Sequence, residues 1–147
     1  MTSYCQLLYI DMILIHQELK EKGLKVTPQR IAIYNAVAHC HNHPTAEYVV
    51  DIIKKDYPNI SVGTVYKVLN VFVENNLLKK VKSEKDVMRY DAMLDHHHHL
   101  YCADTDRIED YKDPELDALV QAYFKKKKIK NFKIENFKLQ ITGKFNK

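Results

Sequence analysis

The sequence has few cysteines and no long apolar run, and each shortage excludes a class of protein. Its three cysteines, Cys5, Cys40 and Cys102, are odd in number and form no Cys-x-x-Cys pair. This argues against a disulfide framework and favours a reducing compartment, so we expect a cytoplasmic protein. No uninterrupted apolar run approaches the roughly 20 residues of a membrane span. An aspartate interrupts the hydrophobic stretch Leu7–Ile15, so neither a signal peptide nor a membrane partner is expected.

The composition is that of a folded domain with a mildly basic surface. The 147 residues fit one mid-sized domain or two small ones, and 46% hydrophobic residues are enough to bury a core. The net charge of +4 and the pI near 8.8 permit nucleic acid as a partner without demanding it.

The first 75 residues carry the start and stop signals of four helices. Residues 6–22 form an expected helix that Gly23 closes. Thr27, followed by proline, then Thr45 and Ser61 are each placed to cap a further helix. Short helices with brief connections predict a helix-turn-helix module.

The helix that Ser61 opens has two different faces. Its apolar residues fall within one arc of about 140°, and they are Val65, Val68, Leu69, Phe72 and Val73. The opposite side carries Gly63, Tyr66, Lys67 and Asn70. A glycine, a phenol, a cation and an amide on one face can approach DNA closely and still offer hydrogen bonds. From pattern alone, a plain amphipathic helix with a solvated face explains it equally well.

A basic hairpin is expected to follow this helix. Residues 78–82 and 87–91 flank a polar turn at 83–86. Helices followed by such a hairpin predict a winged helix. Its wing would lie along the phosphate backbone through Lys79, Lys80, Lys82 and Arg89.

The last third predicts a small mixed α/β unit. Strands are expected over 97–103 and 107–111, then a helix from Asp113-Pro114, then a strand alternating over 137–141. We interpret the run Lys125–Lys128 as a helix C-terminus on a solvated face rather than a nucleic-acid patch. This unit is too small to bury its own sheet and helix, so it is expected to pair with a second copy.

Together these patterns predict an α+β fold of two parts. An N-terminal winged-helix DNA-binding domain covers residues 1–91, a hinge covers 92–95, and a small α/β dimerisation domain covers 96–147.

Packing in an apolar core does not explain the run His96–His99, because histidine is a poor core residue. On a strand, alternate side chains share a face, so His97 and His99 present two imidazoles together, which is half of a metal site. An internal tag or ordinary surface histidines are the alternatives. His43, Asp91 and Asp110 could supply further ligands. A metal held by all five would clamp the two parts at one angle.

Several motifs, taken in order, resemble the ferric uptake regulator (Fur) family of bacterial metal-dependent repressors. They are Thr27-Pro28-Gln29-Arg30, His43-Pro44-Thr45-Ala46, Ser61-Val62-Gly63-Thr64-Val65-Tyr66, Arg89-Tyr90-Asp91, His96–Cys102 and Ile108–Tyr111. The resemblance covers roughly residues 12–143 and is strongest to the peroxide-responsive (PerR) subgroup.

The resemblance implies a function and its residues. The regulatory site falls on His43, Asp91, His97, His99 and Asp110, where aspartate rather than glutamate favours the peroxide-responsive subgroup. This set suits Fe²⁺ or Mn²⁺. With iron, hydrogen peroxide would convert His43 and His97 to 2-oxo-histidine and release operator DNA. The implied DNA contacts are Arg30, Ser61, Gly63, Thr64, Tyr66, Lys67 and Asn70.

The chain also departs from the family pattern. Cys102 stands where a zinc-binding Cys-x-x-Cys pair begins, but Thr105 takes the second position and residues 141–147 contain no cysteine. One thiolate cannot hold tetrahedral zinc, so no structural zinc is predicted. Phe137 replaces the histidine of a further family metal site, leaving His96, His98 and Asp117. Asn70 stands where relatives usually carry arginine, which leaves the operator sequence open.

Other functions remain possible from the sequence. An iron- or zinc-uptake regulator of the same fold would respond to metal occupancy alone. From a different class, a metallohydrolase would use the histidines, but no His-Glu-x-x-His arrangement is present and no enzyme is expected. Metal storage would explain the histidines but not the winged helix. Cys40, flanked by His39 and His41, is interpreted as a buried helix-end cysteine rather than a thiolate site.

Overall fold

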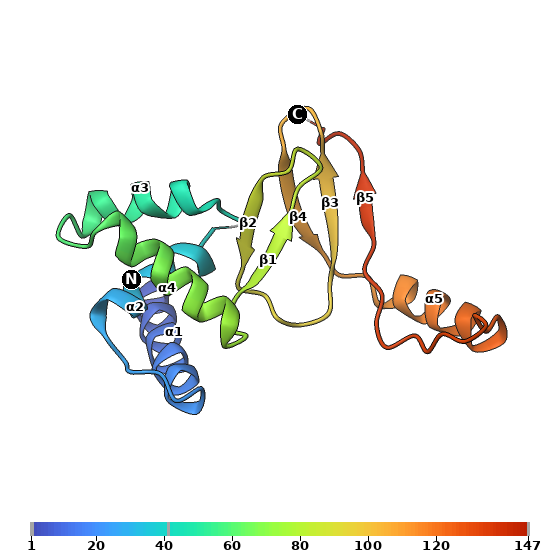
Figure 1. The fold of residues 1–147 in the computed structure, drawn as a ribbon, viewed down its shortest axis with the longest axis horizontal. Helices are drawn as coiled ribbons and strands as arrows, with labels where there is room; N and C mark the ends of the chain where they lie inside the picture. Colours follow the sequence, from blue (N-terminus) through green and yellow to red (C-terminus); the bar gives the residue numbers. More distant parts are fainter. Residues whose placement is uncertain (1, 41, 147) are drawn as a thin grey trace. The chain divides into compact units, whose positions relative to one another are not determined.

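The chain forms two compact units, Met1–Leu94 and Asp95–Lys147. The structure is a computed structural model that describes residues 2–40 and 42–146, with side chains from residue 12 onward (Figure 1). His41 and the side chain of Cys5 therefore lie outside the described part. None of the described helices is both long enough and apolar enough to cross a membrane.

The first unit is built on four helices, of which the last three begin where the sequence predicts, whereas the first begins at Thr2 and not at residue 6. They are α1 (Thr2–Glu21), α2 (Pro28–Ala38), α3 (Ala46–Asp56) and α4 (Val62–Glu74). Each of α2, α3 and α4 is preceded by an extended hydroxyl residue, Thr27, Thr45 or Ser61, whose side chain accepts a backbone N–H of the first turn. The predicted caps are confirmed, and they hold the helix starts through an otherwise unsatisfied donor.

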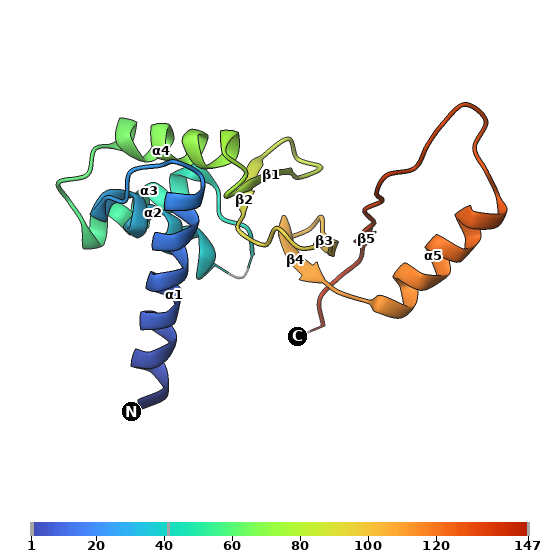
Figure 2. The ribbon, with the colours of Figure 1, turned by 90° about the horizontal axis from the view of Figure 1, so that it is seen from below.

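The helices enclose one apolar core. Leu19, Ile33, Val49, Leu69 and Phe72 are each fully buried there, and Figure 2 shows α2 and α3 between α1 and α4. The apolar face predicted for α4 is thus the face that packs inward. Its opposite face, with Gly63, Tyr66, Lys67 and Asn70, stays exposed.

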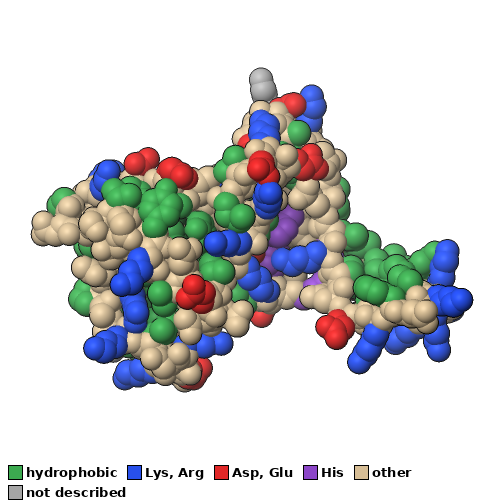
Figure 3. Space-filling model, in the orientation of Figure 1, with side chains coloured by type: hydrophobic (Ala, Val, Ile, Leu, Met, Phe, Trp, Pro, Cys, Tyr) green, Lys and Arg blue, Asp and Glu red, His purple; other side chains and the backbone are tan. Residues whose placement is uncertain are grey.

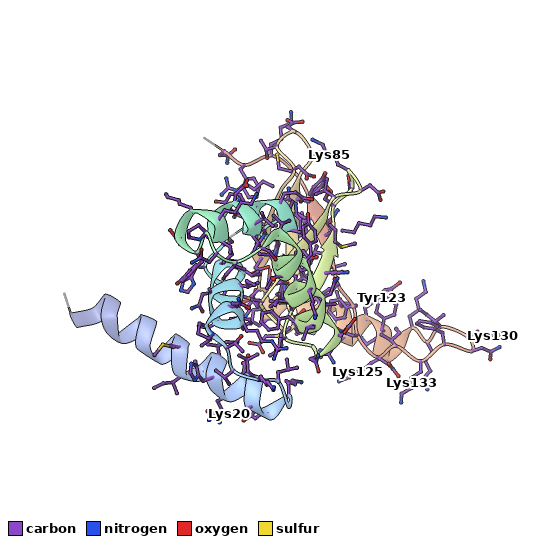
Figure 4. The ribbon with its side chains drawn as sticks, turned by 60° about the vertical axis from the view of Figure 1, so that its left-hand side comes forward. Lys20, Lys85, Tyr123, Lys125, Lys130 and Lys133 are labelled. Carbon is purple, nitrogen blue, oxygen red and sulfur yellow. The ribbon has the colours of Figure 1, made fainter. Side chains whose placement is uncertain are left out.

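A two-stranded antiparallel hairpin follows α4. Strands β1 (Lys79–Lys82) and β2 (Met88–Asp91) pair Lys80 with Tyr90. Tyr90 is buried in the helical core, while Lys85 lies at the exposed tip of the turn (Figure 4). The helices and this wing confirm the predicted winged-helix fold.

The second unit contains a three-stranded sheet in the order β4-β3-β5. Strand β3 (His98–Cys102) pairs antiparallel with β4 (Arg107–Tyr111) and parallel with β5 (Gln140–Thr142). The expected last strand over 137–141 is therefore wrong in extent. Phe137 lies outside it because its ring packs on two imidazoles of the histidine run.

Helix α5 (Pro114–Lys126) leaves its apolar side uncovered. None of its residues is buried, and Leu119 and Tyr123 are 69% and 52% exposed. Together with residues 129–137 it forms an open groove of about 520 Å³, lined by Val120, Phe124, Ile129, Phe132 and Phe137 among others. Figure 3 shows this groove as a green patch over α5, with lysines around it. The lysines of the predicted basic run project outward, as Lys125 does in Figure 4.

Candidate metal centre and DNA-binding surface

Within the second unit, two imidazoles and a carboxylate meet on one face of the sheet. The Nε2 atoms of His97 and His99 are 3.1 Å apart. Asp110, paired with His99 in the β3–β4 register, places Oδ1 3.2 Å from Nε2 of His97 and 3.8 Å from Nε2 of His99. The alternation of side chains along a strand brings the three together.

The orientation of His97 is set by the backbone before it. Its Nδ1 lies 2.7 Å from the Asp95 carbonyl oxygen, which can only accept, so Nδ1 carries the hydrogen. Nε2 is then the nitrogen with a lone pair, and it faces His99 and Asp110. A backbone carbonyl that fixes the second nitrogen is the usual support of a metal-binding histidine.

Within the first unit, His43 and Asp91 form a second pair. His43 Nδ1 lies 3.7 Å from Asp91 Oδ1, and both side chains are buried. The backbone N–H of Met93 donates to the same Asp91 oxygen at 2.7 Å, which fixes the carboxylate. His43 has φ of +48°, a left-handed conformation that is rare for a residue with a Cβ. Its surroundings must hold it there.

Strand β2 supplies that support. The Arg89 guanidinium donates to the His43 carbonyl at 3.0 Å, and the Tyr90 N–H donates to the Pro44 carbonyl at 2.9 Å. Arg89 is half-buried against the His43 loop, and its expected contact with phosphate stays a prediction. The sequence Arg89-Tyr90-Asp91 attaches one ligand candidate, Asp91, to the loop that carries the other.

Both groups have the chemistry of a divalent-metal site. In each, the candidate ligand atoms lie within 4.8 Å of one another, and the donors are imidazole nitrogens and carboxylate oxygens without a thiolate. Such hard and borderline donors suit Fe²⁺ or Mn²⁺, and without a thiolate the set favours Zn²⁺ less than a cysteine-containing site would. The residues present therefore fit the ion that the sequence implies.

A third cluster lies on the opposite face of β3. Asp117 of α5 places Oδ1 2.9 Å from Nε2 of His96 and 2.8 Å from Nε2 of His98. These imidazoles lower the pKa of Asp117, His96 having the largest effect. His98 Nδ1 accepts the Leu139 N–H at 3.2 Å, so its Nε2 carries a hydrogen and donates to Asp117. Phe137 stacks on the His98 ring. Both nitrogens of His98 are engaged, so this cluster ties α5 to the sheet; its ligand atoms also lie within 4.8 Å of one another, as in a metal site.

Around Cys102, where no structural zinc is expected, side-chain contacts connect the neighbouring segments. Hydrogen bonding to Thr105, first through its hydroxyl, lowers the pKa of the buried Cys102 thiol. The Arg107 guanidinium lies over the Phe145 ring, 4.3 Å from its centroid, and Lys144 pairs with Asp104 at 2.9 Å. These contacts join the β3–β4 turn to the C-terminal segment. A single thiolate does not fit tetrahedral zinc.

Cys40 is placed as a helix-end residue. It is half-buried, its Sγ lies 3.0 Å from the Ala36 carbonyl, and burial raises its pKa.

The residues expected to contact DNA lie mostly on the exposed side of α4. Ser61 caps the helix, and Gly63, Tyr66, Lys67 and Asn70 are exposed along it, with Thr64 half-buried. Arg30 lies apart on α2, where its guanidinium donates to the Lys25 carbonyl. The Tyr66 hydroxyl donates to Glu47 at 3.1 Å, a contact that no motif in the sequence predicts. Only the spatial neighbourhood of α3 and α4 reveals that contact.

The fold and the candidate ligands define a regulator that combines a winged helix with a histidine-rich α/β unit. The chain belongs to the ferric uptake regulator family, whose model matches residues 21–142. Members of this family are transcriptional regulators and not enzymes.

Individual relatives share most of the chain. The peroxide operon regulator of Bacillus subtilis is 34% identical over 127 residues, which are 86% of this chain and 86% of that protein. The Helicobacter pylori ferric uptake regulator, a structure with three functional metal-binding sites, superposes with a TM-score of 0.71 at 25% identity, covering 93% of this chain and 91% of the other. The Campylobacter jejuni peroxide stress regulator does so with a TM-score of 0.66 at 25% identity, covering 91% and 95%.

Proposed function

We propose that this protein is a metal-dependent, DNA-binding repressor of peroxide-stress genes that senses hydrogen peroxide by iron-catalysed oxidation of its own histidine ligands. It acts in the cytoplasm as a homodimer on double-stranded operator DNA. The observation that carries the proposal is the pair of ligand groups, His43 with Asp91 in one unit and His97 with His99 and Asp110 in the other.

Each group alone offers too few ligands for a high-affinity site, so both are proposed to bind one Fe²⁺ or Mn²⁺. Residues 92–95 would act as the hinge between a DNA-binding domain (1–91) and a dimerisation domain (96–147). Binding by both groups fixes one relative placement of the domains, and the free energy of binding becomes a preference for the DNA-binding state.

The proposed response to peroxide lies in the ligands themselves. The five ligand candidates would hold the Fe²⁺, which would supply the redox chemistry for cleaving the O–O bond of hydrogen peroxide, and over the whole reaction the imidazole ring gives up the two electrons. One peroxide oxygen adds to the imidazole ring of His43 or His97, giving 2-oxo-histidine, and the other leaves as water. The Asp95 carbonyl, which orients the His97 ring, continues to hold it in place. The altered ring is a poorer ligand, so the domains separate and DNA is released.

The exposed apolar side of α5 supports the proposed homodimer. A patch of this kind rimmed by polar residues is typical of a protein–protein interface. Because one thiolate remains at Cys102, we also propose that the dimer forms without structural zinc.

The test is intact-protein and peptide mass spectrometry after peroxide treatment of Fe²⁺-loaded and Mn²⁺-loaded protein. One added oxygen on His43 or His97 is expected in the iron sample only, with loss of DNA binding in a mobility-shift assay. The exposed His39 and His96 of the same sample are internal controls and should stay unmodified. No adduct, with DNA binding unaffected, would overturn the proposal in favour of an iron- or zinc-uptake regulator.

A second variant separates the two regulators. Asp110→Glu keeps a carboxylate ligand but lengthens its side chain by one methylene, and it is expected to reduce peroxide sensitivity while leaving metal-dependent DNA binding in place. Unchanged sensitivity would remove the main support for the peroxide-responsive subgroup.

A further inference from the structure

A hydrogen bond on the DNA-binding unit joins the exposed side of α4 to an acid on α3. Tyr66 donates its hydroxyl hydrogen to Oε1 of Glu47 at 3.1 Å. Tyr66 is 38% exposed, and Glu47 lies in the exposed first turn of α3, just after the Thr45 cap. Figure 1 shows α3 and α4 next to each other in this unit, and the two helices are in contact.

Glu47 has reason to remain a carboxylate at this position. Its own backbone N–H and then the Tyr66 hydroxyl lower its pKa, and the same bond raises the pKa of Tyr66. Near neutral pH the pair is therefore a charged acceptor and a neutral phenol. Hydrogen bonds to a charged group are stronger than those between neutral groups, so the phenol hydrogen points to Glu47.

That direction restricts what Tyr66 can recognise. A phenol has one hydrogen, and while it is donated to Glu47 the oxygen can only accept. Phosphate oxygens carry no hydrogen to donate, and the Glu47 charge repels them. In the major groove the groups that do donate are the amino groups of adenine and cytosine.

We propose that Glu47 is a specificity-determining residue that holds Tyr66 as a hydrogen-bond acceptor, so that Tyr66 reads an adenine or cytosine amino group rather than a phosphate. The inference rests on the proposed function, because it requires α4 to enter the major groove. Glu47 acts through Tyr66 as a positioning residue. Lys67, one residue further along α4, remains available for phosphate.

The experiment uses full-length, Mn²⁺-loaded protein and a pool of duplex DNA with a randomised central segment, sequenced after binding. The wild-type protein is expected to enrich a motif containing one position where adenine or cytosine dominates. In Glu47→Ala and in Tyr66→Phe the preference at that position falls about three- to tenfold, the range of one hydrogen bond. The double variant falls no further, because both changes remove the same contact.

Two variants make the result specific. Glu47→Gln keeps an acceptor oxygen and should restore most of the preference. Asp51→Asn removes a negative charge from another exposed residue of α3 and should leave the motif unchanged. Independently of DNA, the Tyr66 pKa, measured by NMR on ring-labelled tyrosine, should be lower in Glu47→Ala than in wild type or Asp51→Asn.

The outcomes separate the two proposals. Wild-type protein that selects no motif with Mn²⁺ would overturn the proposed function and this inference with it. A wild-type motif that Glu47→Ala selects equally well would overturn the inference alone. An equal loss in Asp51→Asn would do the same, because general charge would then explain the effect, and so would a Tyr66 pKa that Glu47→Ala leaves unchanged.

Discussion

The two units of this chain differ in how they bury apolar side chains. The first encloses a continuous core that includes Ile33, Val49 and Phe72, whereas α5 of the second contributes no buried residue and leaves Leu119 exposed. A unit with a complete core is expected to be stable by itself. A unit with an open apolar helix needs another surface to cover it. We therefore expect stability to depend mainly on the first unit and assembly on the second.

The largest expected effect tests the core of the first unit. Phe72→Ala removes a fully buried ring and is expected to lower the free energy of unfolding of that unit by about 3–5 kcal/mol. Amide hydrogen exchange with mass spectrometry should show faster exchange in α2, α3 and α4 and little change in β3 and β4. Phe132→Ala, at a residue that is 65% exposed, is the control and should leave α2–α4 protected. Equal loss of protection in both units would contradict the comparison.

An intermediate effect is expected for assembly. Leu119→Asp places a charge in the apolar side of α5 and should weaken the dimer about 30-fold or more, the cost of losing one central interface residue. Sedimentation velocity over a concentration series measures it. Ala118→Asp, an exposed position on the other side of the same helix, is the matched control. A dimer that Leu119→Asp leaves unchanged would place the interface elsewhere, and equal weakening by both variants would mean that added charge alone explains the effect.

The smallest effect is expected for the contacts that join the β3–β4 turn to the C-terminal segment, near Cys102. A double-mutant cycle of Arg107→Ala and Phe145→Ala should give a coupling of about 0.5–1 kcal/mol, typical of an exposed cation–π pair.

Thermal unfolding of the Cys102→Ser variant, with and without a strong chelator, should respond to the chelator as wild type does. A chelator effect that disappears in Cys102→Ser would show a structural metal at that cysteine.

Local signals predicted most of the fold. The hydroxyl caps at Thr27, Thr45 and Ser61 gave the helix starts, because capping depends on a few adjacent residues. The last strand was predicted too long, since alternation along 137–141 does not reveal that Phe137 stacks on His98. Contacts between distant residues decide such cases.

In the candidate sites too, the sequence predicted what depends on adjacent residues and missed what depends on distant ones. The pairing of His97 with His99 follows from strand alternation alone. By contrast, the roles of Arg89 and Glu47 depend on neighbours 46 and 19 residues away. The sequence also led us to regard histidine as a poor core residue, yet His97, His98 and His99 are buried. The Asp95 carbonyl binds one nitrogen of His97, and Asp117 and the Leu139 N–H bind the two nitrogens of His98; the nearness of these groups is not visible in the sequence.

Because the histidines of β3 repeat, they do not by themselves determine the register of β3 against β4 after an insertion or deletion. Sliding β3 by one residue against β4 would bring His98 opposite Asp110 in place of His99, so an imidazole would still face that carboxylate. The same slip would turn Tyr101, now 1% exposed, to the other face of the sheet and away from its buried position. The apolar neighbours therefore hold the alignment that the histidines cannot specify. A length change in the turn at 103–106 would be resisted by Tyr101 and Ile108 rather than by the ligands.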